Sequence, residues 1–355
     1  MEEGSLVGAR IFTAGQIVDG DPPIWEGMAV LSDAKDAYAL VLRQQRAGYD
    51  FIKPYSRLEP SVFAALLSAG RRLNMQIAGH VPQDVSITDA INGGLRTSEH
   101  LIGVLHAVAN DRSLPNPSLS PYDERAKELT LKLGTGEVAT EGFIDPARLQ
   151  ELAELARTKS HWFVPTTRVM RNFGSSPVPY IDGMDRFAGA MELGILPLVK
   201  NGTFGTVFFN LTPEQKAGED RLQELRREAI LGLYNAGAPI LVGTDSFLAG
   251  AGTVAVDEMI SLQELGIPTA AVLRAATLEP ARYLNLEGSL GEVREGAIAD
   301  LLLLNGNPLT DLRVLYTPLG VVKAGEWYDR SALDSMLDEV AASFARQASN
   351  SEASR

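Results

Sequence analysis

Residues 75–100, MQIAGHVPQDVSITDAINGGLRTSEH, hold two short apolar runs that end at His80 and His100, with a helix-like segment between them. Short apolar runs bounded by turn residues are typical of buried parallel strands. Two further runs share the pattern: DFIKPY carries Lys53, and ILVGTD ends at Asp245. In a (β/α) barrel, the reactive side chains lie at the carboxyl ends of the strands. The pattern therefore predicts a barrel with these four side chains at its mouth.

Strand-like and helix-like patterns alternate along the chain, which favours a parallel sheet covered by helices. The strand candidates are residues 9–13, 50–55, 75–79, 95–99, 162–165 and 240–243. Apolar stripes predict helices between them, as along Val62, Leu66 and Ala69. Gly237 is expected to end one helix. Pro268 is expected to open another as its first residue, over PTAAVLRAATLEPARYL.

Six strand candidates are two fewer than a closed (β/α)8 barrel needs. We therefore expect an α/β protein of the TIM-barrel type over residues 1–285, N-terminally incomplete, with its first strands missing. After Leu286, short β-type runs and glycine turns predict a small C-terminal β-sandwich unit over residues 286–330. Residues 331–355 are expected to form an amphipathic helix and a disordered tail. The unpaired edges of an open barrel favour self-association into a homo-oligomer.

The composition of the chain limits the kinds of molecule that it is expected to bind. The chain has 355 residues, 45% of them hydrophobic, with a formal charge of −13 and a pI near 4.9. This charge disfavours binding to nucleic acid or to an anionic membrane. Because the chain has no cysteine, a metal would need histidine, carboxylate or lysine-derived oxygen ligands. The opening MEEGSLVGAR lacks the basic and apolar regions of a signal peptide. As written, the chain is expected to be cytoplasmic, and no compartment is assigned beyond that.

The chain resembles the metal-dependent amidohydrolase superfamily, in its imidazolonepropionase-like and prolidase-like branch. Six motifs carry this resemblance, in the order YDFIKPYS, AGHVPQDV, TSEHL, VGTDS, PTAAVLRAATLEPARYL and SLGEVREGAIADLLLL. The resemblance covers nearly the whole chain and implies a barrel with a binuclear metal centre. It implies metal ligands at a carboxylated Lys53 and at His80, His100 and Asp245. The family's His-x-His pair has no match, because no two of the four histidines lie two residues apart.

The resemblance also implies a chemistry. The cofactor would be a divalent metal, Zn²⁺ by expectation, with two ions in the complete family site and at most one here. The reaction would be hydrolysis of a carbon–nitrogen bond by a metal-activated hydroxide, with Asp245 as the catalytic base. The substrate would be a small-molecule amide, cyclic amide, dipeptide-like compound or N-acyl amino acid, and an ester stays open. The alternative is a catalytically silent truncated barrel, a fragment or pseudoenzyme, that binds a ligand or partner.

Each ligand role has a structural alternative. Most lysines are solvated, but burial of Lys53 between Ile52 and Pro54 would favour the neutral amine that reacts with carbon dioxide. A lone histidine on an apolar strand is commonly a hydrogen-bonded core residue. Two histidines at the ends of neighbouring strands are better explained as zinc ligands. Asp245 could instead cap the helix that follows it.

The remaining candidates are weaker. Tyr55 and Arg57 could hold a substrate carboxylate, or have ordinary surface roles. His106 could line the barrel mouth, or lie on a helix surface. His161 precedes the strand-like WFVP, so we expect it to be structural. The long connection over residues 173–212 is a candidate lid.

Overall fold

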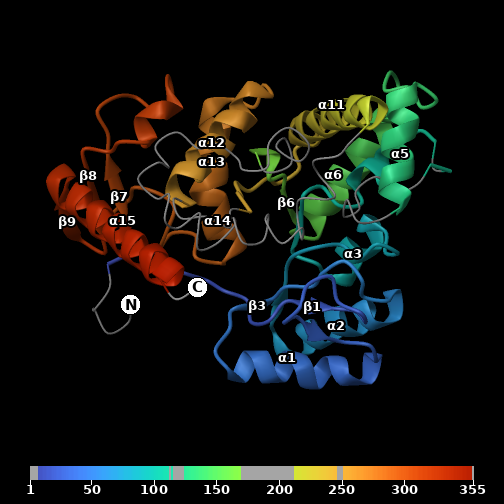
Figure 1. Ribbon diagram of the computed structural model, residues 1–355, viewed down its shortest axis with the longest axis horizontal. Coiled ribbons are helices and arrows are strands. Elements are labelled where there is room, and N and C mark those ends of the chain that lie inside the picture. Colours follow the sequence, from blue (N-terminus) through green and yellow to red (C-terminus); the bar gives the residue numbers. More distant parts are fainter. Residues whose placement is uncertain (1–6, 112, 115–123, 169–211, 246–250, 354–355) are drawn as a thin grey trace. The chain divides into compact units, whose positions relative to one another are not determined.

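The computed structural model describes residues 7–111, 113–114, 124–168, 212–245 and 251–353 (Figure 1). Its contacts divide the chain into two compact units. The sheet unit comprises residues 10–165 and 212–241. The C-terminal unit takes in residues 1–9, 166–211 and 242–355. No helix in the described part of the chain has both the length and the apolar character needed to cross a bilayer.

Short parallel strands form the centre of the sheet unit. They are β1 Val18–Asp19, β2 Ala29–Val30, β3 Phe51–Ile52, β4 Gln76–Ile77, β5 Thr97–Glu99 and β6 Trp162–Val164. Parallel ladders pair β1 with β2, β3 with β4 and β5 with β6. Single parallel bridges join Val18 to Pro54, Gly79 to Ser98 and Phe163 to Ile240. The strands thus follow the order β2–β1–β3–β4–β5–β6, so that from β3 onward neighbours in the sequence are neighbours in space, as in a (β/α) barrel. The described strands do not close into a complete barrel.

The predicted strand at residues 9–13 is wrong, because none of its described residues is in a strand and the Ile11 side chain is 64% exposed. The edge strand lies further along, at β1, where Val18 is fully buried. Asp19 is buried beside it. Its carboxylate accepts the backbone N–H groups of Ile24 at 2.9 Å and Arg57 at 2.6 Å. These hydrogen bonds satisfy an acidic group that would otherwise be costly to bury. The predicted strand at residues 240–243 is reduced to the bridge at Ile240.

The helices of the sheet unit include the one predicted from the apolar stripe at Val62, Leu66 and Ala69. They are the 3₁₀ turn η1 Ala34–Asp36, α1 Ala37–Arg46, α2 Pro60–Leu73, α3 Ile87–Gly93, α4 Val104–Val108, α5 Glu124–Thr135, α6 Pro146–Thr158 and α11 Pro213–Asn235. In α2, the side chains of Val62, Leu66 and Ala69 are at most 3% exposed. Gly237 has a φ of 81° just after α11, the left-handed conformation that the sequence predicts for it.

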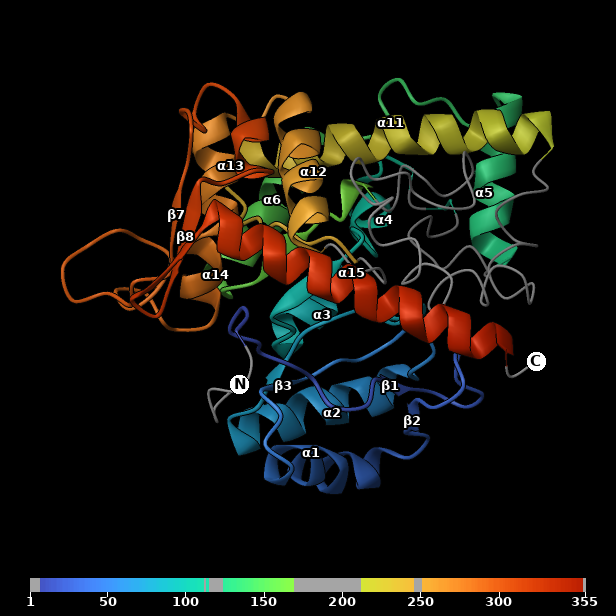
Figure 2. The same ribbon diagram turned by 60° about the vertical axis from the view of Figure 1, so that its left-hand side comes forward.

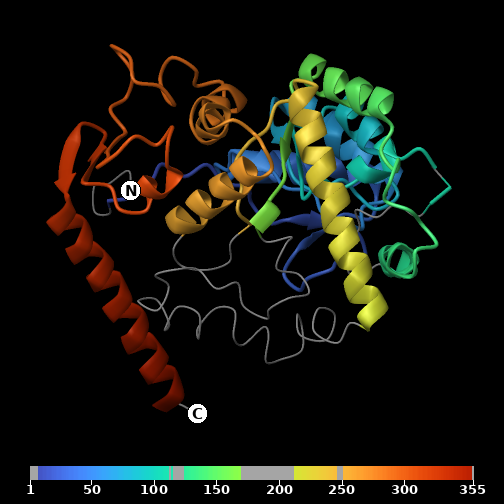
Figure 3. The ribbon, with the colours of Figure 1, turned by 90° about the horizontal axis from the view of Figure 1, so that it is seen from above.

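Glycines bring α11 close to two other helices. A Cβ atom built on Gly134 of α5 would overlap the carbonyl of Glu214, and one built on Gly218 of α11 would overlap that of Thr130. The two backbones are therefore in direct contact where α5 crosses α11 (Figures 1 and 2). Farther along, α11 packs against α6, as Figure 3 shows for the yellow and green helices. These contacts hold the helical layer over the sheet.

The C-terminal unit consists of helices and one antiparallel sheet. Its elements are α12 Ala251–Glu264, α13 Thr269–Ala276, α14 Leu278–Tyr283, β7 Leu301–Leu303, the 3₁₀ turn η3 Leu312–Leu315, β8 Gly320–Lys323, β9 Glu326–Asp329 and α15 Arg330–Ala353. The described strands pair in the order β7–β8–β9. Residues 286–330 thus contain antiparallel strands, and the β-sandwich expected there stays a prediction. Helix α15 takes in residues 350–353 of the tail expected to be disordered.

The single helix predicted from Pro268 is two helices. Helix α13 ends at Ala276, and α14 begins at Leu278 after Thr277, whose φ of −132° is not helical. The cause is Pro280, since its ring excludes the helical position of the carbonyl four residues earlier, on Ala276. Pro268 was expected to be the first helical residue, but it is the N-cap residue of α13, so the helix begins one residue later, at Thr269.

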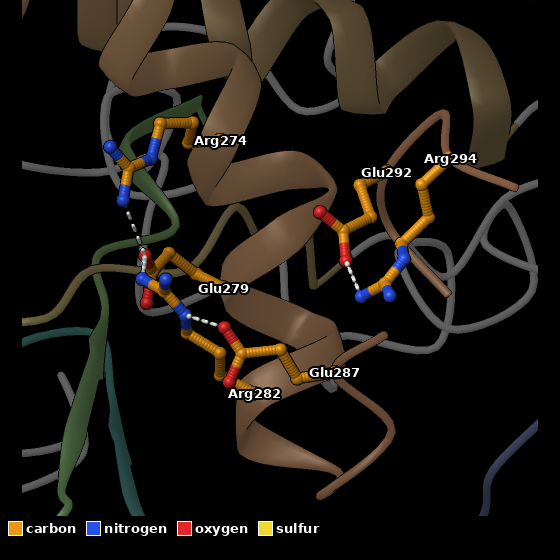
Figure 4. A network of polar contacts seen from close by, with 6 residues as sticks. All are labelled: Arg274, Glu279, Arg282, Glu287, Glu292 and Arg294. Atoms are coloured by element: carbon orange, nitrogen blue, oxygen red, sulfur yellow. Dashed lines mark hydrogen bonds and ion pairs between the residues drawn. The ribbon is translucent and has the colours of Figure 1, made fainter. Parts of the chain in front are cut away.

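Ion pairs fasten α14 to its neighbours (Figure 4). The Arg282 guanidinium lies 3.0 Å from the Glu287 carboxylate and 2.8 Å from that of Glu279, which also pairs with Arg274 at 3.6 Å. The hydrogen bond to Glu287 is the main cause of the raised pKa of Arg282. Because exposed ion pairs are screened by solvent, this network orients α14 more than it stabilises the fold.

Candidate metal centre

Three neighbouring strands place chemically active side chains together. Lys53 directly follows β3, His80 lies three residues after β4, and Glu99 and His100 lie at the end of β5. Backbone hydrogen bonds fix these ends: the His80 N–H donates to the Pro54 carbonyl at 3.1 Å. The parallel arrangement thus brings three of the four predicted ligands, Lys53, His80 and His100, to the same edge of the sheet.

The side chains meet around Glu99. Its carboxylate oxygen Oε2 lies 2.9 Å from Lys53 Nζ and 4.0 Å from His80 Nε2. The rings of His80 and His100 lie edge to face, with centroids 5.0 Å apart. His80, Glu99 and His100 each offer one ligand atom, and these atoms all lie within 4.8 Å of one another. Three donors at this separation can converge on a single ion.

A turn in the backbone explains how two consecutive residues reach one site. In a strand, successive side chains point to opposite faces, so Glu99 and His100 would normally diverge. His100 has a φ of 61° and Leu101 a φ of 57°, both left-handed. Residues other than glycine seldom adopt this conformation, which clusters at functional sites. The left-handed turn ends β5 and directs both side chains to the same place.

Neighbouring side chains hold the His80 ring in one orientation. Its ring is buried, and its Nδ1 lies 3.1 Å from the Ser56 hydroxyl, which leaves Nε2 on the side of Glu99. The Tyr55 ring stacks on it with a centroid separation of 4.0 Å. Burial lowers the pKa of His80 well below its usual value, and the charges of His100 and Lys53 act in the same direction. A neutral imidazole whose other nitrogen is hydrogen-bonded is typical of metal-binding histidines.

The donor set fits a divalent metal. Two imidazoles and one carboxylate are a known ligand set of catalytic zinc, which keeps a further position open for water or substrate. The cluster is partly accessible, with 21% of the Glu99 side chain and 24% of the Lys53 side chain exposed. Sequence reasoning missed Glu99 because strand alternation places it opposite His100. It also missed Ser56, whose only signal was its closeness to Lys53.

The weaker candidates lie at or beside this cluster. Tyr55 is part of it, and its hydroxyl accepts the indole N–H of Trp25 at 3.1 Å. Arg57 is exposed, and its guanidinium donates to the carbonyl of Pro22 at 2.9 Å. The structure thus shows the Arg57 head group bonded to the backbone, and its predicted contact with a substrate stays a prediction.

His106 lies on α4 and is not among the clustered ligands. It lines a cavity of about 800 Å³ in the sheet unit, between the segment at residues 83–89, α5 and α6. Arg125 and Arg148 also line this cavity. The charged groups there are balanced, since Arg125 pairs with Asp84 at 2.8 Å. None of the residues that line this cavity belongs to the cluster of His80, Glu99 and His100.

Asp245 and the candidate lid stay predictions. Asp245 is half-buried and has a left-handed φ of 48°, but it belongs to the C-terminal unit. Its membership of a centre shared with His80 and His100 is therefore carried by the sequence alone. Residues 173–211 of the lid lie outside the described residues.

His161 has the structural role predicted for it. It is fully buried, with Nδ1 2.8 Å from the Leu95 carbonyl and Nε2 3.0 Å from the Ser98 hydroxyl. Burial lowers its pKa to about 4. The hydrogen bond to Leu95 acts to raise the pKa, and the charge of Arg96 acts to lower it. Both ring nitrogens serve to tie β5 to β6.

Comparison with known proteins gives one family and several similar structures. Residues 184–328 match the model of the amidohydrolase family. An ochratoxinase from Aspergillus niger is 30% identical over 112 residues, which are 31% of this chain and 23% of the ochratoxinase. The chain therefore matches less than a quarter of the length of that curated relative.

Solved structures share the fold over most of the chain. A bottromycin amidohydrolase superposes with a TM-score of 0.64 and 23% identity, covering 93% of this chain and 68% of that one. A Xaa-Pro dipeptidase superposes with a TM-score of 0.58 and 20% identity, covering 92% of this chain and 70% of that one. The A. niger ochratoxinase superposes with a TM-score of 0.60 and 18% identity, covering 92% of this chain and 68% of that one. Residues 184–328 are thus similar to the amidohydrolase family, and the solved structures share the α/β fold of this chain.

Proposed function

We propose that this chain is a metal-dependent hydrolase that cleaves a carbon–nitrogen bond in a small-molecule amide. The observation that carries the proposal is the convergence of His80, Glu99 and His100 within 4.8 Å at the carboxyl ends of β4 and β5. Catalytic residues of (β/α) barrels lie at this end of the strands. The match of residues 184–328 to the amidohydrolase family supports the same chemistry.

His80 and His100 are the nitrogen ligands of the proposed centre. The oxygen ligand comes from the side chains that meet them, Glu99 or a carboxylated Lys53. When bound, a divalent ion supplies electrophilic activation of water and of the substrate carbonyl. Ser56 and Tyr55 hold the His80 ring in place, so that its Nε2 faces the cluster without reorganisation.

Asp245 is the proposed general base. A carboxylate at the end of a barrel strand can take a proton from the attacking water and deliver it to the leaving nitrogen. This two-step role lets a single group serve as base and then as acid. Zinc is the proposed ion because a His₂Glu set is typical of zinc hydrolases.

The substrate class follows from what the similar proteins are. One is a Xaa-Pro dipeptidase and another a bottromycin amidohydrolase, so dipeptide-like amides are the first substrates to test, followed by the cyclic amides expected from the sequence. N-acyl amino acids extend the same bond type. The net charge of −13 makes small molecules more suitable partners than polyanions.

Turnover by metal-loaded and metal-stripped protein tests the proposal. The chain is purified, loaded with zinc and assayed on Xaa-Pro dipeptides, N-acyl amino acids and cyclic amides, each beside the matching ester. We expect amide turnover that chelation abolishes and zinc restores. His80→Asn should lower kcat by at least about 100-fold, since even changes around metal ligands cost 10–100-fold. His106→Asn is the matched control and should keep its bound zinc, because His106 is not among the clustered ligands.

Two results would contradict the proposal. Amide turnover that survives complete chelation would remove the metal from the mechanism. Zinc binding without turnover of any amide or ester would instead support a catalytically silent barrel that binds a ligand.

A further inference from the structure

We infer that Trp25 forms an apolar surface beside the proposed metal centre, and that this surface selects amides with an aromatic or large aliphatic group next to the scissile bond. This selection rests on the proposed function, because it concerns the substrate of the same centre. It gives a specificity role to a residue that lies outside the six motifs of the family resemblance. The substrate class is thereby narrowed from any small amide to an apolar one.

Trp25 lies in the short loop between β1 and β2, and hydrogen bonds hold this loop against the residues that follow β3. The buried Asp19 carboxylate accepts the N–H of Ile24 at 2.9 Å and that of Arg57 at 2.6 Å. The Arg57 guanidinium donates in turn to the Pro22 carbonyl at 2.9 Å. Because these bonds join the loop to a neighbouring strand end, the indole has a defined position beside β3.

A chain of ring contacts leads from Trp25 to the proposed ligands. Its indole N–H donates to the Tyr55 hydroxyl at 3.1 Å. The Tyr55 ring stacks on that of His80 with centroids 4.0 Å apart, and the His80 ring lies 5.0 Å from the ring of His100. All four residues belong to the sheet unit. A single residue, Tyr55, thus links the indole to a proposed metal ligand.

The indole brings hydrocarbon surface to this place. Its one polar atom is the N–H, which donates to Tyr55, and the other ring atoms are apolar. The side chain is half-buried, and the residues before it, Pro22, Pro23 and Ile24, continue the apolar character of the loop. Small-molecule sites typically combine apolar surface with a few polar groups that orient the ligand. Here the metal ligands are the polar groups, and the indole suits an apolar group of the substrate.

The other possible role of Trp25 is to hold the Tyr55 hydroxyl, in which case the N–H matters and the ring surface does not. Two substitutions separate these roles. Trp25→Phe keeps an apolar ring but has no donor, whereas Trp25→Gln keeps an N–H donor but loses the ring. The matched control is Trp327→Gln, because Trp327 is 51% exposed and lies on β9 of the C-terminal unit.

Paired substrates measure the selection. The zinc-loaded chain is assayed on N-benzoylglycine beside N-acetylglycine, which varies the acyl side, and on N-acetylphenylalanine beside N-acetylglycine, which varies the amine side. We expect a preference for the larger member of at least one pair by about tenfold or more in kcat/KM, the effect that apolar contacts give. Trp25→Gln should lose this preference, with KM for the larger substrate raised more than kcat is lowered. Trp25→Phe and Trp327→Gln should keep it.

A second measurement needs no variant and no turnover. The zinc-loaded chain is mixed with N-benzoylglycine or N-acetylphenylalanine, and nuclear Overhauser effects are recorded between the aromatic ring of the bound compound and the Trp25 indole. We expect such an effect for at least one of the two compounds. Its absence for both, in samples where binding is seen, would overturn the inference.

The outcomes separate this inference from the proposed function. If amides are hydrolysed without preference in either pair, or if Trp25→Gln keeps the preference, the inference is wrong and the proposed function stands. A preference lost in Trp25→Phe but kept in Trp25→Gln would limit Trp25 to holding Tyr55, which also overturns it. If no amide is hydrolysed, the proposed function fails, and the Overhauser measurement still decides whether Trp25 contacts a bound amide.

Discussion

The buried His161 should make the stability of the fold depend on pH. Burial lowers its pKa to about 4 in the folded chain, against the usual 6.5 of an unperturbed histidine. Because the folded pKa is the lower one, the unfolded chain binds the extra proton first. The contribution of His161 to stability is therefore complete above about pH 6.5 and is lost as the pH falls towards 4.

The size of the effect follows from the shift. One pKa unit corresponds to about 1.4 kcal/mol, so the full loss is roughly 3 kcal/mol, of which about 2 kcal/mol is lost between pH 7 and pH 5. His161→Gln removes the titration and keeps a donor for the Leu95 carbonyl. Urea unfolding at pH 8, 7 and 5, with a chelator present, measures the difference.

We expect the variant to lose about 2 kcal/mol less than the unmodified chain between pH 7 and pH 5. His80 also has a lowered pKa, but it is present in both proteins and cancels in the comparison. Between pH 8 and pH 7 the two proteins should respond alike, which serves as the control. An equal loss of stability in both proteins at pH 5 would refute the reasoning.

Four substitutions test other parts of the fold by urea unfolding. Gly134→Ala should destabilise by about 1–3 kcal/mol because the added Cβ forces α5 and α11 apart. A Cβ added at Gly252 would meet nothing within 4 Å, so Gly252→Ala should stabilise its helix by up to about 1 kcal/mol. Equal changes in stability for Gly134→Ala and Gly252→Ala would contradict this account. Glu258→Gln should cost about 2–3 kcal/mol, since a buried carboxylate loses charge-assisted hydrogen bonds. Glu279→Gln should cost about 1 kcal/mol or less, an effect that 1 M salt removes if the Arg282 network is only a surface one.

Much of the sheet unit could be predicted from the sequence because its apolar runs are short and clearly bounded. The runs at residues 75–79 and 95–99 contain β4 and β5, and each is followed by its histidine. The apolar stripe at Val62, Leu66 and Ala69 also predicted α2. These elements depend on local pattern, which a single sequence carries.

Other features depend on contacts that a sequence does not display. The edge strand β1 contains Asp19, a residue that is unfavourable in a buried strand until its hydrogen bonds to Ile24 and Arg57 are known. The break between α13 and α14 could have been found, because Pro280 is visible in the sequence and a proline excludes a helical carbonyl four residues earlier. Glu99 could not, since only the left-handed backbone of His100 brings it to the site.

The central claim is that His80, Glu99 and His100 bind one metal ion. Anomalous diffraction at the zinc absorption edge, from crystals grown with zinc, tests this most directly. We predict a peak about 2.0–2.1 Å from His80 Nε2 and from a ring nitrogen of His100, with a Glu99 oxygen about 2.0–2.2 Å away. Crystals that show no peak at these residues, or a peak elsewhere with His80 and His100 unbound, would contradict the account.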